Sequence, residues 1–326
     1  MKRILLMLIF VVFTVCILTH SQISLFYALS GITLWYEKML PSLVPFMILS
    51  GIMVRLHLTE GFSALLYPVI GKLYRVSKNG CYAMFIGFLC GFPMGAKTIA
   101  DLMEQKMISE SEGAYLLTFC NNIGPVYFCS FVLPLLHRRL LWPYVFGMYG
   151  IPLLYGLLLR YTLFRKYPAP LWRQGGLATG SEPVRTADLR AAHKTHAAHS
   201  DGLSVLTAID DSIRSAMQSA LGLCGYMILF NLFNLVPHLI FGEIPVRMAP
   251  LFEITGGLSL IGDKQPLYVL LLLPFGGLSC IAQTYHCIRN TSLSIASYTL
   301  HKIILTLLCA GYYLLWYLCV GNTFLH

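Results

Sequence analysis

The stretch that decides the fold is Gly91-Phe92-Pro93-Met94-Gly95-Ala96-Lys97-Thr98, which interrupts a hydrophobic segment beginning at Cys81. Pro93 lacks a backbone N–H and breaks a helix, while Gly91 and Gly95 let the backbone leave helical geometry. A helix break at membrane depth is tolerated only where it lines a cavity or is buried in protein. The stretch therefore predicts an interrupted membrane helix beside a cavity or a protein interface.

The residues after the break predict an anion site. Ala96 to Met103 can form a second half-helix, whose N-terminal amides and dipole attract negative charge. Lys97 lies at its start, and a lysine in a membrane is costly unless it meets an anion, water or a carboxylate. The alternative is that the span ends near Gly95 and Lys97 reaches out to the interface.

The composition places this break in a polytopic membrane protein. Of the 326 residues, 57% are hydrophobic and 11% are charged, which excludes an ordinary soluble domain. The apolar residues form runs long enough to cross a bilayer as helices, and the alternating segments of a β-barrel are missing. The net charge of +9 fits basic cytoplasmic loops, so we expect a lipid bilayer and no nucleic acid as partner.

Charge and composition also divide the chain into four parts. Residues 1–30 hold an apolar helix after Lys2-Arg3, which we expect to be an uncleaved transmembrane helix with a cytoplasmic N-terminus. Residues 31–163 form a first membrane repeat with an extra span, and 203–326 form a second repeat. Between them, 164–202 is a basic linker rich in Pro and Gly, which we expect to be cytoplasmic.

The two halves share short matches at a nearly constant separation. Phe46-Met47-Ile48-Leu49 resembles Tyr226-Met227-Ile228-Leu229 at an offset of 180 residues. The break at 91–95 resembles Pro274-Phe275-Gly276-Gly277, and SEGAYL at 111–116 resembles SIASYT at 294–299, both at 183. Duplicated halves with interrupted helices at matching positions are typical of secondary transporters. The predicted fold is all-α, with two related, inverted repeats and re-entrant or broken helices.

Three further groups of residues are candidates for the solute site. The second break offers Phe275, Gly276 and Gly277 with the neutral polar side chains of Ser279 and Gln283. Asn121 and Asn122 interrupt another apolar run, where they either bind a solute or join helices. Glu253, near Thr255, is either a proton or sodium partner or the carboxylate that starts a helix.

We expect no cofactor, no metal and no enzymatic activity. The ten cysteines include no CxxC pair, and no cysteine or carboxylate completes a metal site with the histidines at 193, 196 and 199. Ser279 in a GxSx context, with His286 or His301 as a base, could belong to an intramembrane protease. However, Ser279 and His286 lie about 10 Å apart along one helix, too far for a hydrogen bond.

Together, GFPMGAK at 91–97, FCNNIGP at 119–125, EITGG at 253–257 and FGGLS with Gln283 resemble the YlbJ family of sporulation integral membrane proteins, which carry the nucleoside-recognition Gate domain. The resemblance covers about Gly31 to Tyr317. It implies export of dipicolinic acid, a planar aromatic dianion, from the mother cell across the outer forespore membrane. Phe92 or Phe275 would contact its ring, and Lys97, Thr98 and the Asn amides would bind its carboxylates.

The sequence leaves several alternatives open. The leading hypothesis is a transporter of a small anionic solute in a bacterial cytoplasmic membrane, with Na+ or H+ as an undetermined coupling ion. One alternative is a membrane scaffold for spore envelope or cortex assembly that acts through the linker, and a lesser one is a nucleoside or ion transporter. Whether the chain forms a homo-oligomer also stays open.

Overall fold

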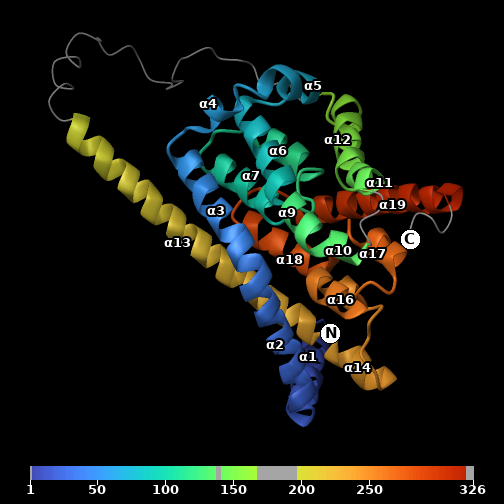
Figure 1. Ribbon diagram of the computed structural model, residues 1–326. Helices are drawn as coiled ribbons and strands as arrows, with labels where there is room; N and C mark the ends of the chain where they lie inside the picture. Colours follow the sequence, from blue (N-terminus) through green and yellow to red (C-terminus); the bar gives the residue numbers. More distant parts are fainter. Residues whose placement is uncertain (1, 137–140, 167–196, 321–326) are drawn as a thin grey trace, which may run out of the picture.

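The computed structural model describes residues 2–136, 141–166 and 197–320, and these residues form helices joined by turns (Figure 1). The first half contains α1 (Lys2–Thr19), α2 (Ser21–Leu34), η1 (Trp35–Met39), α3 (Leu40–Arg55), α4 (Thr59–Ser63), η2 (Tyr67–Gly71), α5 (Lys72–Tyr74), α6 (Lys78–Cys90), α7 (Met94–Glu104), α8 (Glu110–Leu117), α9 (Pro125–Tyr127), η3 (Phe128–Val132), α10 (Leu133–Leu135), α11 (Leu141–Val145), η4 (Phe146–Gly150) and α12 (Ile151–Tyr161). The second half contains α13 (Ala197–Leu232), α14 (Leu235–Phe241), α15 (Ala249–Phe252), α16 (Ile254–Ile261), α17 (Pro266–Leu272), α18 (Gly277–Ile288) and α19 (Ile295–Val320). The elements labelled η are π-helical turns, which continue neighbouring α-helices.

Five helical stretches in the described residues are long and apolar enough to cross a bilayer. They are Ser21–Arg55, Trp142–Tyr161, Ser204–Phe241, Pro266–Ile288 and Ile295–Cys319. This confirms the predicted all-helical, polytopic membrane architecture. The helix at Arg3–Thr19 is apolar but shorter than these five, so the transmembrane role expected for residues 1–30 stays a prediction.

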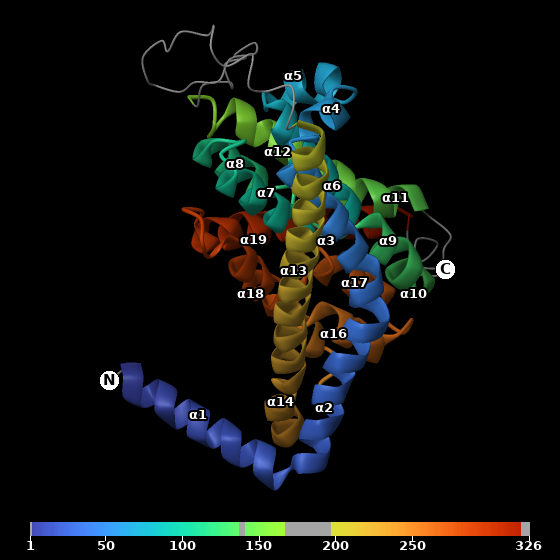
Figure 2. The ribbon, with the colours of Figure 1, turned by 90° about the vertical axis from the view of Figure 1, so that its left-hand side faces the viewer.

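The long helix α13 forms a frame with α2 and α3, which run beside it (Figures 1 and 2). Gly31 permits their close approach, because a Cβ there would lie 2.9 Å from the Ile228 Cα atom. The Trp35 side chain Nε1 also donates a hydrogen bond to the Ala220 carbonyl at 2.9 Å. Figure 2 shows α1 projecting away from this frame.

The predicted first break is confirmed. Helix α6 ends at Cys90, α7 begins at Met94, and the two pack against each other. Gly91 adopts a φ of +80°, and a Cβ on it would lie 2.2 Å from the Gly124 backbone nitrogen. Glycine is therefore required both by the left-handed backbone and by the contact with the Cys120–Pro125 segment.

The second break lies between α17 and α18. Gly276 and Gly277 both have positive φ values, +76° and +78°. Helix α17 packs against α19, and α18 packs against α13 and α7. Phe92 belongs to an apolar core cluster with Leu258, Leu270 and Tyr313, so this core joins the two breaks.

The basic linker predicted at 164–202 lies mostly outside the described residues, as do its histidines at 193 and 196. No group of three or more His, Cys, Asp or Glu side chains that could bind a metal ion occurs within the described part of the chain.

Candidate functional site

A polar cavity of about 550 Å³ lies between α3, α7, α13 and α18. Its ionisable lining consists of Arg55, Lys97, Asp101, Glu104, Asp211, Arg214, His286 and Arg289. Its neutral polar lining includes Ser215, Gln218, Ser219, Asn290 and Thr291. Pockets of this size hold small molecules, and basic side chains that converge on one suit an anionic ligand.

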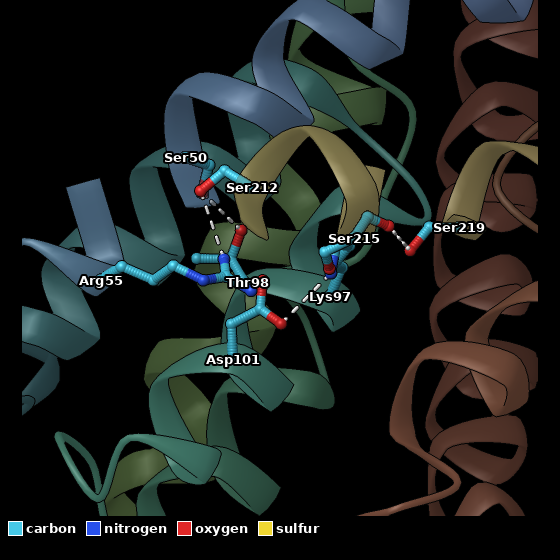
Figure 3. Close-up of polar contacts among 8 residues, drawn as sticks. All are labelled: Ser50, Arg55, Lys97, Thr98, Asp101, Ser212, Ser215 and Ser219. Carbon is cyan, nitrogen blue, oxygen red and sulfur yellow. Dashed lines mark hydrogen bonds and ion pairs between the residues drawn. The ribbon is translucent and has the colours of Figure 1, made fainter. Parts of the chain in front are cut away.

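Lys97 lies deep in this cavity, on the first turns of α7 after the break. Its side chain is largely buried, with the residue 8% exposed. Nζ donates to Asp101 Oδ1 at 3.2 Å and to Ser215 Oγ of α13 at 3.0 Å (Figure 3). The ion pair with Asp101 offsets the cost of burying the ammonium.

Asp101 faces two cations. Burial raises the pKa of its carboxyl above the ordinary value, and the charges of Lys97 and the more distant Arg55 oppose that shift. Figure 3 shows Asp101 on the side of α7 that faces Arg55 of α3. Protonation of Asp101 would therefore leave two cations in the cavity without this compensating negative charge.

The other basic groups of the cavity are paired differently. Arg55 donates from Nη1 to Ser212 Oγ at 3.3 Å, and Arg214 on the exposed face of α13 pairs with Asp210 at 2.9 Å. Among the described residues, Arg289 has no ion-pair partner. Arg55 and Arg289 are therefore the cations most available to a ligand carboxylate.

A hydrogen bond beside the cavity joins α7 to α3; α7 and α18, the helices that follow the two breaks, are called the first and the second arm. Thr98 is fully buried, and its Oγ1 lies 3.3 Å from Ser50 Oγ on α3 (Figure 3). Thr98 therefore holds α7 against α3 at the residue that follows Lys97, and it does not line the cavity.

The two breaks meet in the protein interior rather than at this cavity. The Phe92 backbone N–H donates to the Asn122 carbonyl at 2.6 Å, and a Cβ on Gly276 would lie 2.7 Å from Phe92 Cζ. A Cβ on Gly95 would lie 2.5 Å from the Cys120 carbonyl oxygen. Phe92 and Gly276 therefore meet across the two halves, whereas Gly91 and Gly95 pack on the Cys120–Pro125 segment of the first half.

Asn121 and Asn122 join helices at this interface. Asn121 Nδ2 donates to Thr284 Oγ1 at 2.9 Å and to Tyr298 OH at 3.1 Å, and its Oδ1 accepts from the Ala96 N–H at 3.4 Å. Asn122 Nδ2 donates to the Phe119 carbonyl. Of the two sequence interpretations, this geometry matches helix–helix hydrogen bonding.

Glu253 caps α16 and is 1% exposed. Its oxygens accept from the Thr255 N–H at 3.1 Å, the Gly256 N–H at 2.6 Å and Asn231 Nδ2 at 3.3 Å. Thr255 accepts from Tyr127 OH at 3.2 Å. Of the two alternatives for Glu253, the structure matches the helix-start carboxylate.

Phe92 and Thr255 also border a small apolar cavity of about 30 Å³, too small for an aromatic dianion. On α18, Gln283 Nε2 donates to Ser279 Oγ at 2.8 Å, and both side chains are buried. Phe275 and Gly277 lie at the turn into α18, where Gly277 packs on the Pro250 and Phe252 carbonyls. Of the predicted site residues, Lys97 alone lines the large polar cavity.

Sequence analysis missed several residues that matter in the structure. Arg55 and Arg289 end apolar helices and resemble interface charges, so nothing local distinguishes them. Lys302, in contrast, is a charge within the apolar run at 295–320, and such a residue is a recognised functional signal in a membrane helix.

Comparison with known proteins agrees with the helical membrane architecture. The chain is 25% identical over 323 residues to the sporulation integral membrane protein YlbJ of Bacillus subtilis (strain 168), covering 90% of this chain and 78% of that protein. No family model and no solved structure matches the chain. The chain is thus similar over nine-tenths of its length to a sporulation integral membrane protein, and its long apolar helices identify an integral membrane protein.

Proposed function

We propose that this protein transports a small anionic solute, and that the cavity lined by Arg55, Lys97 and Arg289 binds it. The observation that carries the proposal is a cavity of about 550 Å³ with buried and rim cations, set among helices that are long enough to span a bilayer. A charged side chain within a membrane protein is usually retained for a polar ligand or partner. The resemblance to the YlbJ family makes dipicolinate the solute of choice, moved from the mother cell toward the forespore.

We further propose that the two halves are related, inverted repeats. The helices that follow the two breaks begin at Met94 and Gly277, a separation of 183 residues. The next helix in each half follows a serine that accepts from the backbone N–H three residues on, Ser109 from Glu112 at 3.2 Å and Ser294 from Ser297 at 3.3 Å. Movement of one half against the other would then expose the cavity alternately to the two sides.

The test is uptake of labelled dipicolinate into proteoliposomes. Wild-type protein should give saturable uptake that a nucleoside does not inhibit. Lys97→Ala and Arg289→Gln should each reduce uptake at least about tenfold, the loss expected when a charge-assisted hydrogen bond to the ligand is removed. Lys264→Gln, which removes an exposed lysine outside the cavity, is the matched control and should transport normally.

The same assay separates transport from the scaffold alternative. Scrambling residues 173–200 should leave uptake intact if the cavity acts alone. Absence of uptake by well-folded protein under imposed proton and sodium gradients would contradict the proposed transport of dipicolinate. Inhibition by a nucleoside would instead favour the nucleoside transporter.

A further inference from the structure

Lys302 is a buried lysine at the interface of the two halves. It lies on α19 with 2% of the residue exposed, and it is among the largest fully buried side chains. Taking an ammonium out of water costs several kcal/mol unless other groups replace its hydration. The groups that contact this ammonium therefore form a site that accommodates a cation.

Those partners are oxygen dipoles and an aromatic face. Nζ donates to the Asn121 carbonyl at 2.8 Å and lies 3.4 Å from Asn122 Oδ1. It also lies 4.9 Å from the centroid of the Phe92 ring. Neither of the two ion pairs found in the described residues includes Lys302.

The oxygens come from an unwound segment. Helix α8 ends at Leu117 and α9 begins at Pro125, so the Asn121 carbonyl lies in a segment between helices, where it accepts from Lys302 Nζ. In transporters with interrupted helices, unwound carbonyls of this kind coordinate the coupling cation. Hard cations such as Na+ prefer these same ligands, carbonyl and amide oxygens.

The lysine and its acceptors come from opposite halves. Lys302 is 181 residues from Asn121 and 180 from Asn122, close to the separation of the repeated segments. The ammonium therefore joins positions that are near-equivalent in the two halves. It also lies against Phe92 of the first break, so it contacts the junction on which relative movement of the halves depends.

We propose that the Lys302 ammonium occupies a cation-binding position at this junction, so that the protein supplies the cation from its own side chain and moves its solute without sodium. The cation position is inferred from the contacts alone. The sodium independence rests on the proposed transport function.

Thermal unfolding of the purified full-length protein tests the cation position. Replacing Lys302 by Ala removes the ammonium and leaves the oxygens and space for a free ion. Lys302→Ala should melt below wild type in choline chloride, and equimolar sodium chloride should raise its Tm by at least about 3 °C, because an ion that binds the folded state stabilises it. Wild type should melt at the same temperature in both salts.

Two further variants keep the test decisive. Lys302→Ser leaves the same space and a hydroxyl ligand, and should respond to sodium as the Ala variant does. Lys302→Met fills the space without charge, and should melt below wild type and be indifferent to sodium. Equal melting of the Ala and Ser variants in the two salts, or an equal sodium response in the Met variant, would overturn the cation position.

Uptake in proteoliposomes tests the second part. Wild-type uptake should be the same in sodium and in choline, whereas Lys302→Ala should need sodium for uptake. A wild-type protein driven by a sodium gradient would overturn sodium independence. If no variant transports but the melting pattern holds, the cation position stands and the proposed transport function fails.

Discussion

The two interrupted segments follow similar plans but carry different chemistry. Both contain a glycine turn and then a helix, α7 or α18, that starts 183 residues from its counterpart. At the same offset, Lys97 and Asp101 of α7 correspond to Cys280 and Thr284 of α18. The charged pair lines the polar cavity, whereas Cys280 and Thr284 are buried and neutral.

Corresponding positions of α7 and α18 therefore play different parts: Lys97 faces the cavity, whereas Thr284 joins helices by a hydrogen bond. Helix α7 presents Lys97 and Asp101 to the polar cavity, whereas α18 presents His286 there and hydrogen-bonds Asn121 through Thr284 in the protein interior. The buried lysine of the second half, Lys302, lies instead on α19. A repeat can thus retain its backbone pattern while corresponding positions differ in charge.

The largest expected effect concerns the turns themselves. Gly91→Ala should lower the stability of the protein by at least about 3 kcal/mol, since a left-handed alanine and a backbone clash add together. Gly277→Ala should cost about 1–2 kcal/mol, because its Cβ would meet backbone atoms only at 3.0–3.2 Å. Thermal unfolding in detergent measures both.

Gly311→Ala is the control for these glycine variants. Gly311 lies within α19, and a Cβ there would have no neighbour within 4 Å, so the substitution should change stability little or raise it slightly. If Gly91→Ala proves no worse than Gly277→Ala, the tight contact between the first break and Gly124 does not hold.

The next effect concerns the charge of the first arm. As the pH falls from neutral into the acid range, Asp101 should take up a proton at a higher pH than an exposed aspartate, because burial raises its pKa. Loss of this negative charge frees Lys97 and should strengthen anion binding several-fold. Calorimetry with benzenedisulfonate, an aromatic dianion that does not itself titrate in this range, measures the change.

Two variants identify the titrating group. Asp101→Asn should bind the dianion at neutral pH as tightly as wild type does in acid, with a flattened pH dependence. His286 also lines the cavity, and His286→Gln should retain the dependence if Asp101 is responsible. A pH profile that disappears only in His286→Gln would assign the effect to the second arm.

The breaks could be predicted from the sequence because their cause is local. Gly91, Pro93 and the Cys120–Pro125 segment disfavour helix by their own backbone chemistry, whatever surrounds them. The predicted solute site stays a prediction, and of its residues only Lys97 lines the large polar cavity. Polar residues in an interrupted helix can face a cavity or another helix, and only tertiary packing decides which.

The contact between Lys302 and Asn122 illustrates that limit. These two residues are 180 positions apart in the sequence. The similar offset between the repeats does not predict that corresponding positions touch each other. The charge of Lys302 within an apolar helix was visible in the sequence, but its acceptors were not. The cavity likewise depends on Arg55, Lys97 and Arg289 meeting from three helices.

The smallest expected effect concerns Thr284 of the second arm. Thr284→Val removes the hydroxyl that accepts from Asn121 Nδ2 at 2.9 Å. Asn121 Nδ2 keeps its bond to Tyr298 OH at 3.1 Å, so the loss of stability should be only about 1 kcal/mol. Thermal unfolding should show this small loss, and dipicolinate uptake should remain near the wild-type rate.

Thr284→Ser is the matched control, because it keeps the hydroxyl and should behave as wild type in both measurements. Asp101→Val, at the corresponding position of the first arm, should lower the stability of the protein by more than Thr284→Val does, since it leaves Lys97 without its ion-pair partner. If a folded Thr284→Val protein loses uptake while Thr284→Ser retains it, the hydroxyl of the second arm takes part in solute movement. The interface around Thr284 and Asn121 would then itself belong to the solute path.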